Sequence, residues 1–257
     1  MTLETLNLTK SFGGLCAVDG VSFTASTGEL TCITGPNGAG KTTVFNLLTK
    51  VYQPTTGVVI LDGKDTAGMN AVQANKLGIA RTFQNIRLFG NMTVEENVRI
   101  GLHNQIKYGM FSGIFRLPAY WKQEKKQHEK ALELLSIFDM QGMAQYRAGS
   151  LPYGAQRRLE IVRALATHPK LLLLDEPAAG MNPHETEELM ENIIKIRDRF
   201  QIAVMLIEHD MNLVMGICEG ICVLNYGRII AKGTASEIQQ NPTVIEAYLG
   251  KRKEAQA

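Results

Sequence analysis

Hydrophobic and polar positions along the chain follow two periods, one typical of strands and one typical of helices. Apolar and polar residues alternate over 3–8, which predicts a strand, and short apolar runs recur further along. The later strands are expected at 30–33, 58–61, 171–174, 202–207, 221–224 and 229–231, the last two as a hairpin. Because the runs 171–174 and 202–207 contain no polar residue, they indicate strands buried on both faces of a mostly parallel sheet.

Helical spacing marks the other segments. A helix is expected over 42–51, another begins with a capping box of Thr93 and Glu96, and Asn182 caps one whose first residue is Pro183. A short helix is expected over 244–249. The helix expected over 121–138 gathers its apolar residues on one face, namely Ala131, Leu134, Leu135 and Phe138, and the helix after Pro183 does so with Leu189, Ile193, Ile194 and Ile196.

Strand signals are absent between about 85 and 165, where helical spacing dominates. We therefore predict an α/β core formed by residues 1–84 and 166–250, a mainly helical subdomain at 85–165 and a solvated tail at 251–257. A chain of 257 residues is long enough to bury such a core without disulfides. Its formal charge of +2 argues against a protein built around a basic nucleic-acid surface.

The chain has no apolar run longer than six residues and no signal-peptide pattern at its start, so we expect it to be neither secreted nor membrane-spanning, and cytoplasmic. Its cysteines, Cys16, Cys32, Cys218 and Cys222, form no CxxC pair. We expect them to act as small buried apolar residues. The alternative, half of a metal site at Cys218 and Cys222, lacks a second pair of ligands.

A phosphate-binding pattern lies between a predicted strand and a predicted helix. Residues 35–42, GPNGAGKT, fit GxxxxGK[ST], in which glycines let several backbone N–H groups face phosphate oxygens. Lys41 supplies a mobile cation, and the Thr42 hydroxyl is a ligand for Mg²⁺. The alternative is a glycine-rich turn with an incidental lysine, which this context disfavours.

Two acidic residues follow the apolar run 171–174. Asp175 is a candidate for holding Mg²⁺, and Glu176 for polarising a water that attacks the γ-phosphate. His209 follows the strand 202–207, where a strand-end side chain can reach a terminal phosphate. A lone histidine is more often structural, and Gln84 by itself would be interpreted as a surface residue. The presence of the phosphate loop in the same chain favours a role in nucleotide binding or hydrolysis for both.

The order and spacing of these motifs resemble those of ABC-type ATPase subunits over nearly the whole chain. The finer resemblance is to the LivG-type ATP-binding subunits of bacterial branched-chain amino-acid importers. It is carried by residues 10–14 (KSFGG), 81–89 (RTFQNIRLF), 178–183 (AAGMNP), 207–214 (IEHDMNLV) and 241–250 (NPTVIEAYLG).

The resemblance implies the P-loop ATPase fold with an N-terminal antiparallel β element, and ATP and Mg²⁺ as cofactors. It assigns catalysis to Glu176, His209 and Gln84. Mg²⁺ would be bound by Thr42, Gln84 and Asp175. Phe12 would stack on adenine, the alternative being a core phenylalanine at a strand end. The implied nucleotide contacts are Phe12, Val18, Gly35, Pro36, Asn37, Gly38, Ala39, Gly40, Lys41, Thr42 and Thr43, with Leu151, Pro152, Tyr153 and Gly154 completing the site of a second subunit.

The signature segment, residues 151–155, departs from the family consensus LSGGQ because it reads LPYGA. Pro152 offers neither the hydroxyl nor the backbone N–H of the usual serine. Similar importers tolerate proline and tyrosine at the second and third positions, so only Ala155 is unusual. Asn182 likewise stands where aspartate is more common. The sequence therefore supports the nucleotide contact made by the signature segment of a second subunit less strongly than the contact made by the phosphate loop.

The resemblance implies several partners, namely a second ATPase subunit, membrane permeases and, through them, an external substrate-binding protein. The chain would then be peripheral on the cytoplasmic face of the membrane. We expect the permease to dock beside Ile86, Leu88 and Phe89, with the apolar stretch 108–118 as a weaker candidate contact. The alternatives are an ABC ATPase with other cargo, a DNA- or translation-associated ABC ATPase, and a P-loop kinase. Leucine, isoleucine or valine as cargo rests on the resemblance alone.

Overall fold

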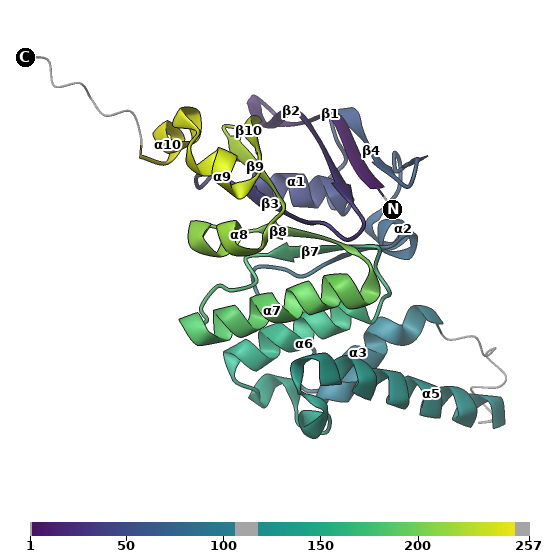
Figure 1. Cartoon of the computed structure of the whole chain (residues 1–257). Helices are drawn as coiled ribbons and strands as arrows, with labels where there is room; N and C mark the ends of the chain where they lie inside the picture. Colours follow the sequence, from purple (N-terminus) through teal and green to yellow (C-terminus); the bar gives the residue numbers. More distant parts are fainter. Residues whose placement is uncertain (1, 106–117, 250–257) are drawn as a thin grey trace, which may run out of the picture. The chain divides into compact units, whose positions relative to one another are not determined.

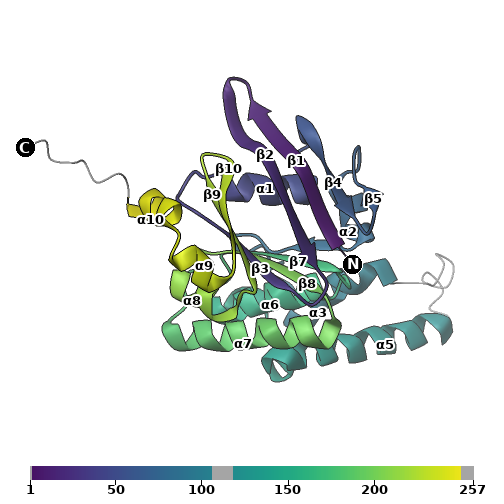
Figure 2. The same cartoon turned by 45° about the horizontal axis from the view of Figure 1, so that its top comes forward.

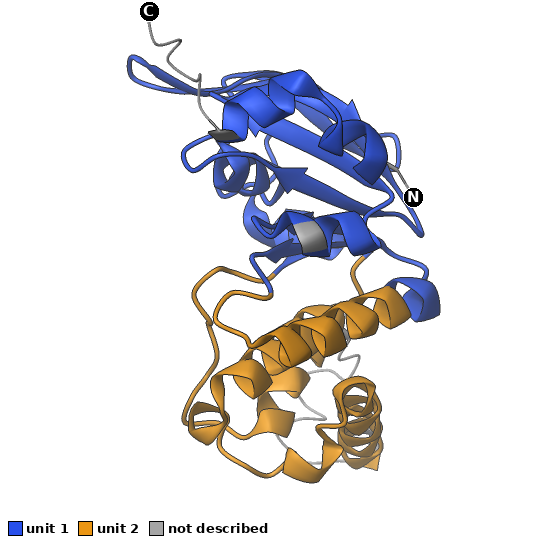
Figure 3. Cartoon of the chain, turned by 60° about the vertical axis from the view of Figure 1, so that its left-hand side comes forward, with its two compact units in different colours: residues 1–81, 170–177, 197–257 blue, residues 82–169, 178–196 orange. Residues whose placement is uncertain are grey.

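A computed structural model describes residues 2–105 and 118–249, which divide into two compact units (Figure 3). Unit 1 comprises residues 1–81, 170–177 and 197–257, and unit 2 comprises 82–169 and 178–196. The expected division differs at 82–84, 166–169 and 178–196, all of which group with the helical unit. Residues 178–196 do so because Glu185 and Glu188 contact Gly154 and Arg158 there. The stretch 108–117 and the tail 251–257 lie outside the described residues.

Unit 1 contains a four-stranded antiparallel sheet in the order β2-β1-β4-β5 (Figure 2). Its strands are β1 (Thr2–Phe12), β2 (Leu15–Ser26), β4 (Thr56–Leu61) and β5 (Lys64–Asp65). The expected N-terminal β element is therefore present, and β1 extends beyond 3–8. Sequence patterning missed β2 because Asp19 and Gly20 interrupt its alternation, where the pairing with β1 shifts register.

The second sheet of unit 1 has six strands in the order β10-β9-β3-β8-β7-β6, and all of them except β6 are labelled in Figure 1. They are β3 (Leu30–Thr34), β6 (Ile79–Arg81), β7 (Leu171–Asp175), β8 (Ala203–Ile207), β9 (Gly220–Asn225) and β10 (Arg228–Gly233). All neighbours are parallel except the β9–β10 hairpin. Every residue of β7 and β8 is buried, which confirms the interpretation of their uninterrupted apolar runs.

The helices of unit 1 are α1 (Lys41–Leu48), α2 (Ala71–Leu77), α8 (Met211–Ile217), α9 (Ala235–Gln239) and α10 (Pro242–Leu249). Helix α1 ends three residues before the predicted boundary. The Thr49 hydroxyl donates to the Phe45 carbonyl (2.8 Å), and Lys50 has φ +58°, a left-handed conformation that stops a helix. Phe45 and its apolar neighbours on α1 share one buried core with strands of both sheets.

Unit 2 is built from α3 (Val94–Gly101), α5 (Pro118–Leu135), α6 (Tyr153–Leu165) and most of α7 (Pro183–Phe200), with 3-10 turns at Leu102–Gln105, Ser136–Phe138, Gln141–Met143 and Ala148–Ser150. The predicted capping box of α3 is present, since Thr93 and Glu96 each accept the other's backbone N–H (2.7 and 3.1 Å). The apolar faces are buried as expected except at Ile194, which is half-buried. The buried residues are Ala131, Leu134, Leu135, Phe138, Leu189, Ile193 and Ile196.

The four cysteines differ in their burial. Cys32 and Cys218 are buried and Cys222 is half-buried, but Cys16 is exposed, so the prediction is wrong for Cys16. It lies at the start of β2, where the strand projects past the core residues that begin at Val18. Among residues 2–105 and 118–249, no helix combines the length and the apolar character needed to cross a bilayer.

Candidate functional site: the phosphate loop and the carboxylates

The phosphate loop (residues 35–42) connects β3 to α1 and requires glycine at two positions. Gly35 has φ +143°, and a Cβ there would lie 2.0 Å from the Leu224 carbonyl oxygen. Gly40 has φ +102°, and a Cβ there would lie 2.4 Å from the Ala17 carbonyl oxygen. Only glycine adopts these conformations against neighbouring backbone. The loop is thereby held in the turn that presents the N-terminus of α1.

Lys41 is the first residue of α1 and is 6% exposed. Its ammonium donates to the carbonyl oxygens of Gly35 (2.7 Å) and Pro36 (2.9 Å) in its own loop. Burial lowers the pKa of Lys41, while the charges of Glu176 and Asp175 oppose that shift. The phosphate-loop cation, Asp175 at the end of β7 and Glu176 directly after it are therefore electrostatic neighbours.

Two further segments of unit 1 fix the phosphate loop from outside it. In the β9–β10 turn, the Gly227 N–H donates to the Ala39 carbonyl (2.9 Å). On α10, the Tyr248 hydroxyl and the Thr34 hydroxyl are 2.8 Å apart at the end of β3. A hollow of about 540 Å³ lies between residues 36–39, the β9–β10 turn and α10. The C-terminal elements thus form part of the loop's surroundings, which sequence reasoning did not foresee.

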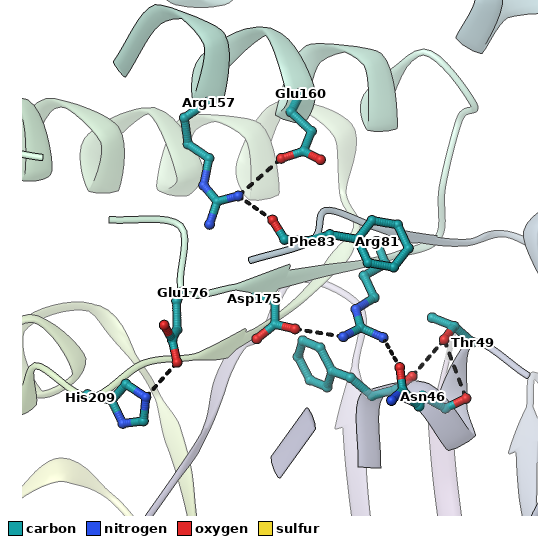
Figure 4. A network of polar contacts seen from close by, with 10 residues as sticks. Asn46, Thr49, Arg81, Phe83, Arg157, Glu160, Asp175, Glu176 and His209 are labelled. Atoms are coloured by element: carbon teal, nitrogen blue, oxygen red, sulfur yellow. Dashed lines mark hydrogen bonds and ion pairs between the residues drawn. The ribbon is translucent and has the colours of Figure 1, made fainter. Parts of the chain in front are cut away.

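Asp175 ends β7 and is 3% exposed. Its Oδ2 accepts a hydrogen bond from Nη2 of Arg81 at 2.6 Å, and Nη1 of Arg81 donates to Oδ1 of Asn46 at 2.6 Å (Figure 4). A buried carboxylate needs such a partner, because removing a charge from water is costly. Sequence reasoning missed Arg81, although an arginine at the end of a buried strand three residues before Gln84 was a usable signal.

Glu176 and His209 come together at the ends of β7 and β8. Oε1 of Glu176 lies 2.6 Å from Nε2 of His209 (Figure 4), and the two side chains are 18% and 41% exposed. The Glu176 N–H donates to the Ile207 carbonyl (2.9 Å), and Glu176 has φ +48°. A left-handed non-glycine residue stores about 1–3 kcal/mol of strain, which is typical of functional positions. The structure therefore brings together two of the residues expected in catalysis, and their roles stay a prediction.

Phe12, the expected adenine contact, ends β1 with 42% of its surface exposed. The rings of Phe12 and Tyr52 form an edge-to-face pair with their centroids 5.2 Å apart, and the Lys10 ammonium lies 5.1 Å from the Phe12 centroid. The exposure disfavours the alternative of a core phenylalanine. Val18, by contrast, is fully buried in the core of unit 1. Tyr52 was missed, and its signal was an aromatic residue in the turn after α1.

Gln84 lies in the glutamine loop (residues 83–89) of unit 2 and is exposed. Two fully buried side chains of α6 hold this loop. Arg157 donates to the Phe83 carbonyl and, at 3.1 Å, to Oε2 of Glu160 (Figure 4). Oε1 of Glu160 accepts the Arg87 N–H at 3.3 Å. Helix α6 and the glutamine loop are therefore joined by hydrogen bonds. Sequence reasoning missed this connection. The available signal was a pair of opposite charges, Arg157 and Glu160, three residues apart on an otherwise apolar helix face.

The signature segment ends where α6 begins. Pro152 is the N-cap of α6 and no side chain caps this end, in agreement with the missing hydroxyl. Tyr153 is 46% exposed and lies against Gly180, whereas Gly154 faces the Glu185 carboxylate. The first-turn N–H groups of such a helix favour an anion. Phosphate-loop residues and the pair Glu176–His209 meet in unit 1, while Gln84 and the signature segment belong to unit 2.

Comparisons with known proteins agree with this arrangement. The ABC transporter family model matches residues 18–179, and a model described as branched-chain amino acid ATP-binding cassette transporter matches residues 228–254. The chain is 46% identical to the high-affinity branched-chain amino acid transport ATP-binding protein BraF of Pseudomonas aeruginosa, and 45% identical to LivG of Escherichia coli. Each alignment covers 96% of this chain and 97% of the relative.

Solved structures show the same fold. A nucleotide-free ATP-binding cassette from an ABC transporter has a TM-score of 0.84 at 32% identity, covering 98% of this chain and all of that chain. A dimeric cassette in a post-hydrolysis state, bound to ADP and phosphate, has a TM-score of 0.77 at 26% identity and covers 91% and 98% of the two chains. The expected P-loop ATPase fold is confirmed.

Proposed function

Because the chain belongs to the ABC transporter family of ATP-binding proteins, we propose that it binds and hydrolyses ATP to power the import of branched-chain amino acids through separate membrane permeases. The observation that carries the chemistry is the 2.6 Å contact between Glu176 and His209 beside the phosphate loop. Support for the cargo comes from the names of the relatives and from the family model at residues 228–254.

The residues at the site fit ATP with Mg²⁺. Thr42 and Asp175 supply the hydroxyl and carboxylate oxygens that Mg²⁺ prefers, and the phosphate loop supplies backbone N–H groups. When bound, Mg²⁺ neutralises charge on the phosphate oxygens. Lys41 already faces two loop carbonyls that terminal phosphate oxygens would replace as its partners. Gln84 would contact Mg²⁺ and the γ-phosphate, and the glutamine loop would relay nucleotide binding to the permease.

Glu176 and His209 have different roles in hydrolysis. Glu176 takes the proton from the attacking water, and a short contact to His209 orients its carboxylate. The second histidine nitrogen, Nδ1, would hydrogen-bond the γ-phosphate. Because β7 and β8 are fully buried and paired in register up to Asp175 and Ile207, the ends of the two strands are fixed one residue before Glu176 and two residues before His209.

We infer that two subunits act together, each completing the other's site with Leu151, Pro152, Tyr153 and Gly154. Support comes from a related cassette that is a dimer with ADP and phosphate and from the uncapped start of α6. Attached to its permeases, the subunit would lie at the cytoplasmic face of the membrane, and a substrate-binding protein would deliver cargo on the far side.

The test of the function uses Glu176→Gln. This variant should retain ATP binding, form an ATP-stabilised dimer and hydrolyse ATP about 10²–10⁴-fold more slowly, the usual worth of a positioned general base. ATPase assays and light scattering measure both effects. Glu187→Gln, an exposed glutamate on α7, is the matched control. If Glu176→Gln hydrolyses ATP at the normal rate, the catalytic assignment is wrong.

We further propose that the permease docks at the glutamine loop. Phe89 is 49% exposed, while Ile86 and Leu88 are half-buried beside it. The loop is anchored, since Asn97 exchanges hydrogen bonds with both backbone groups of Phe89 (3.0 and 3.1 Å). A cysteine replacing Phe89 should cross-link to a cytoplasmic loop of the permease in an ATP-dependent yield. Cross-links that map only to residues 234–250 would contradict this docking site.

A further inference from the structure

Arg81 connects three elements of unit 1 around the carboxylate of Asp175. Its guanidinium donates to Oδ2 of Asp175 and to Oδ1 of Asn46, both at 2.6 Å, and lies 5.5 Å from the centre of the Phe45 ring. The side chains of Arg81 and Asp175 are each 4% exposed. Figure 4 shows the guanidinium between the end of β7 and helix α1. This ion pair is therefore buried and fixed on several sides.

Strand register explains why these two residues meet. Arg81 on β6 pairs with Leu173 on β7, and Asp175 lies two residues beyond Leu173 on the same face. That face packs in the core that includes Phe45 and Leu173. A guanidinium stays charged at every physiological pH, so Asp175 has a permanent cation beside it.

Asp175 is also the carboxylate proposed to hold Mg²⁺, so two cations share one buried carboxylate. Bringing Mg²⁺ next to a charge-paired carboxylate gains less than bringing it next to a bare one, and the guanidinium repels the incoming ion. Asn46 and Phe45 restrain the guanidinium, so it cannot simply move into solvent. Arg81 contacts neither substrate nor reacting atoms on this arrangement, so its role is that of a positioning residue.

We propose that Arg81 is the resident counter-ion of Asp175, which keeps this carboxylate paired before nucleotide arrives and raises the Mg²⁺ concentration that the ATP site requires. The inference rests on the proposed magnesium role of Asp175. It makes the affinity of the site for Mg²⁺ adjustable by a residue that is not itself a ligand.

The experiment measures binding of a fluorescent ATP analogue at a series of buffered Mg²⁺ concentrations. Arg81→Met should lower the half-saturating Mg²⁺ concentration by roughly ten- to a hundredfold, the equivalent of one charge-assisted hydrogen bond. Arg81→Lys, which keeps the charge, should stay near the wild type. Arg228→Met is the matched control, because Arg228 pairs with Asp19 at 2.6 Å in the same unit but is 72% exposed.

Two further measurements separate this role from a structural one. In an Asp175→Asn background, Arg81→Met should no longer change the Mg²⁺ dependence, as a double-mutant cycle requires. In thermal unfolding without nucleotide, added Mg²⁺ should stabilise Arg81→Met more than the wild type. Arg81→Gln, which preserves polarity, serves the same comparisons if the methionine variant does not fold.

An unchanged or increased Mg²⁺ requirement in the neutral variants overturns the counter-ion role of Arg81 while leaving the magnesium role of Asp175 intact. Nucleotide binding that is independent of Mg²⁺ in the wild type overturns both. A lowered requirement that persists in the Asp175→Asn background also overturns the proposal, because the effect would then not act through Asp175.

Discussion

Replacing Arg157 by methionine tests whether α6 holds the glutamine loop through a buried charge. Methionine approximates the length and volume of the arginine stem, so the change removes the guanidinium without opening a large cavity. The guanidinium donates to the Phe83 carbonyl and to Glu160, and the two side chains are 0% and 2% exposed. The variant therefore leaves a buried carboxylate without its nearest cation.

The size of the effect follows from that burial. Breaking a buried ion pair on one side costs about 3–5 kcal/mol in free energy of unfolding. At about 2–4 °C per kcal/mol for a chain of this size, the midpoint of thermal unfolding should fall by roughly 6–20 °C. The double variant Arg157→Met with Glu160→Gln should be more stable than Arg157→Met alone, because residue 160 then carries no buried charge that needs the lost guanidinium.

Thermal and denaturant unfolding of both single variants and the double variant provide the assay. Hydrogen exchange adds a local readout, since the backbone N–H of Arg87, which donates to Glu160, should exchange faster. Arg158→Met is the matched control: its side chain is 27% exposed and its ion pair with Glu188 (3.5 Å) is worth at most about 1 kcal/mol. A loss for Arg157→Met no larger than for Arg158→Met would refute the reasoning.

Three other predictions address the nucleotide site. Lys41→Ala should abolish ATP-supported transport by weakening phosphate binding, and normal nucleotide titration of that variant would contradict the phosphate-loop assignment. Pro152→Ser restores a hydroxyl and an N–H at the signature segment and should raise basal ATPase turnover about ten- to a hundredfold; Ala155 is kept, because it is 6% exposed and a glutamine there would overpack the helix. Burial raises the pKa of the Tyr248 phenol in the folded protein. The phenol therefore contributes its full stabilisation at neutral pH, and this contribution is lost as the pH rises above the unfolded-state pKa of about 10. Tyr248→Phe should cost about 0.5–1.5 kcal/mol at neutral pH and remove that alkaline loss, as urea unfolding at several pH values will measure.

The parts of the site that depend on local conformation were readable from the sequence. The glycines of the phosphate loop adopt φ values that other residues avoid, so their spacing alone indicates the turn. Apolar runs such as 171–174 predict buried strands because no polar side chain needs solvent. The acidic and histidine residues at those strand ends follow, since parallel strands deliver their carboxyl ends to one edge. Asn182 and Pro183 likewise determine the start of α7 by local hydrogen bonding.

Partners distant in the sequence were decided only by the tertiary structure. Arg81 reaches Asp175 across 94 positions because β6 and β7 pair in one register, and a shift by a single residue would turn Arg81 to the other face of the sheet. Arg157 meets Phe83 across 74 positions because α6 buries that face. A buried charge takes its partner from whatever the fold brings within hydrogen-bond distance, and no local pattern encodes that choice. The motifs alone therefore identified the chemistry, and strand register and helix packing selected the side chains that surround it.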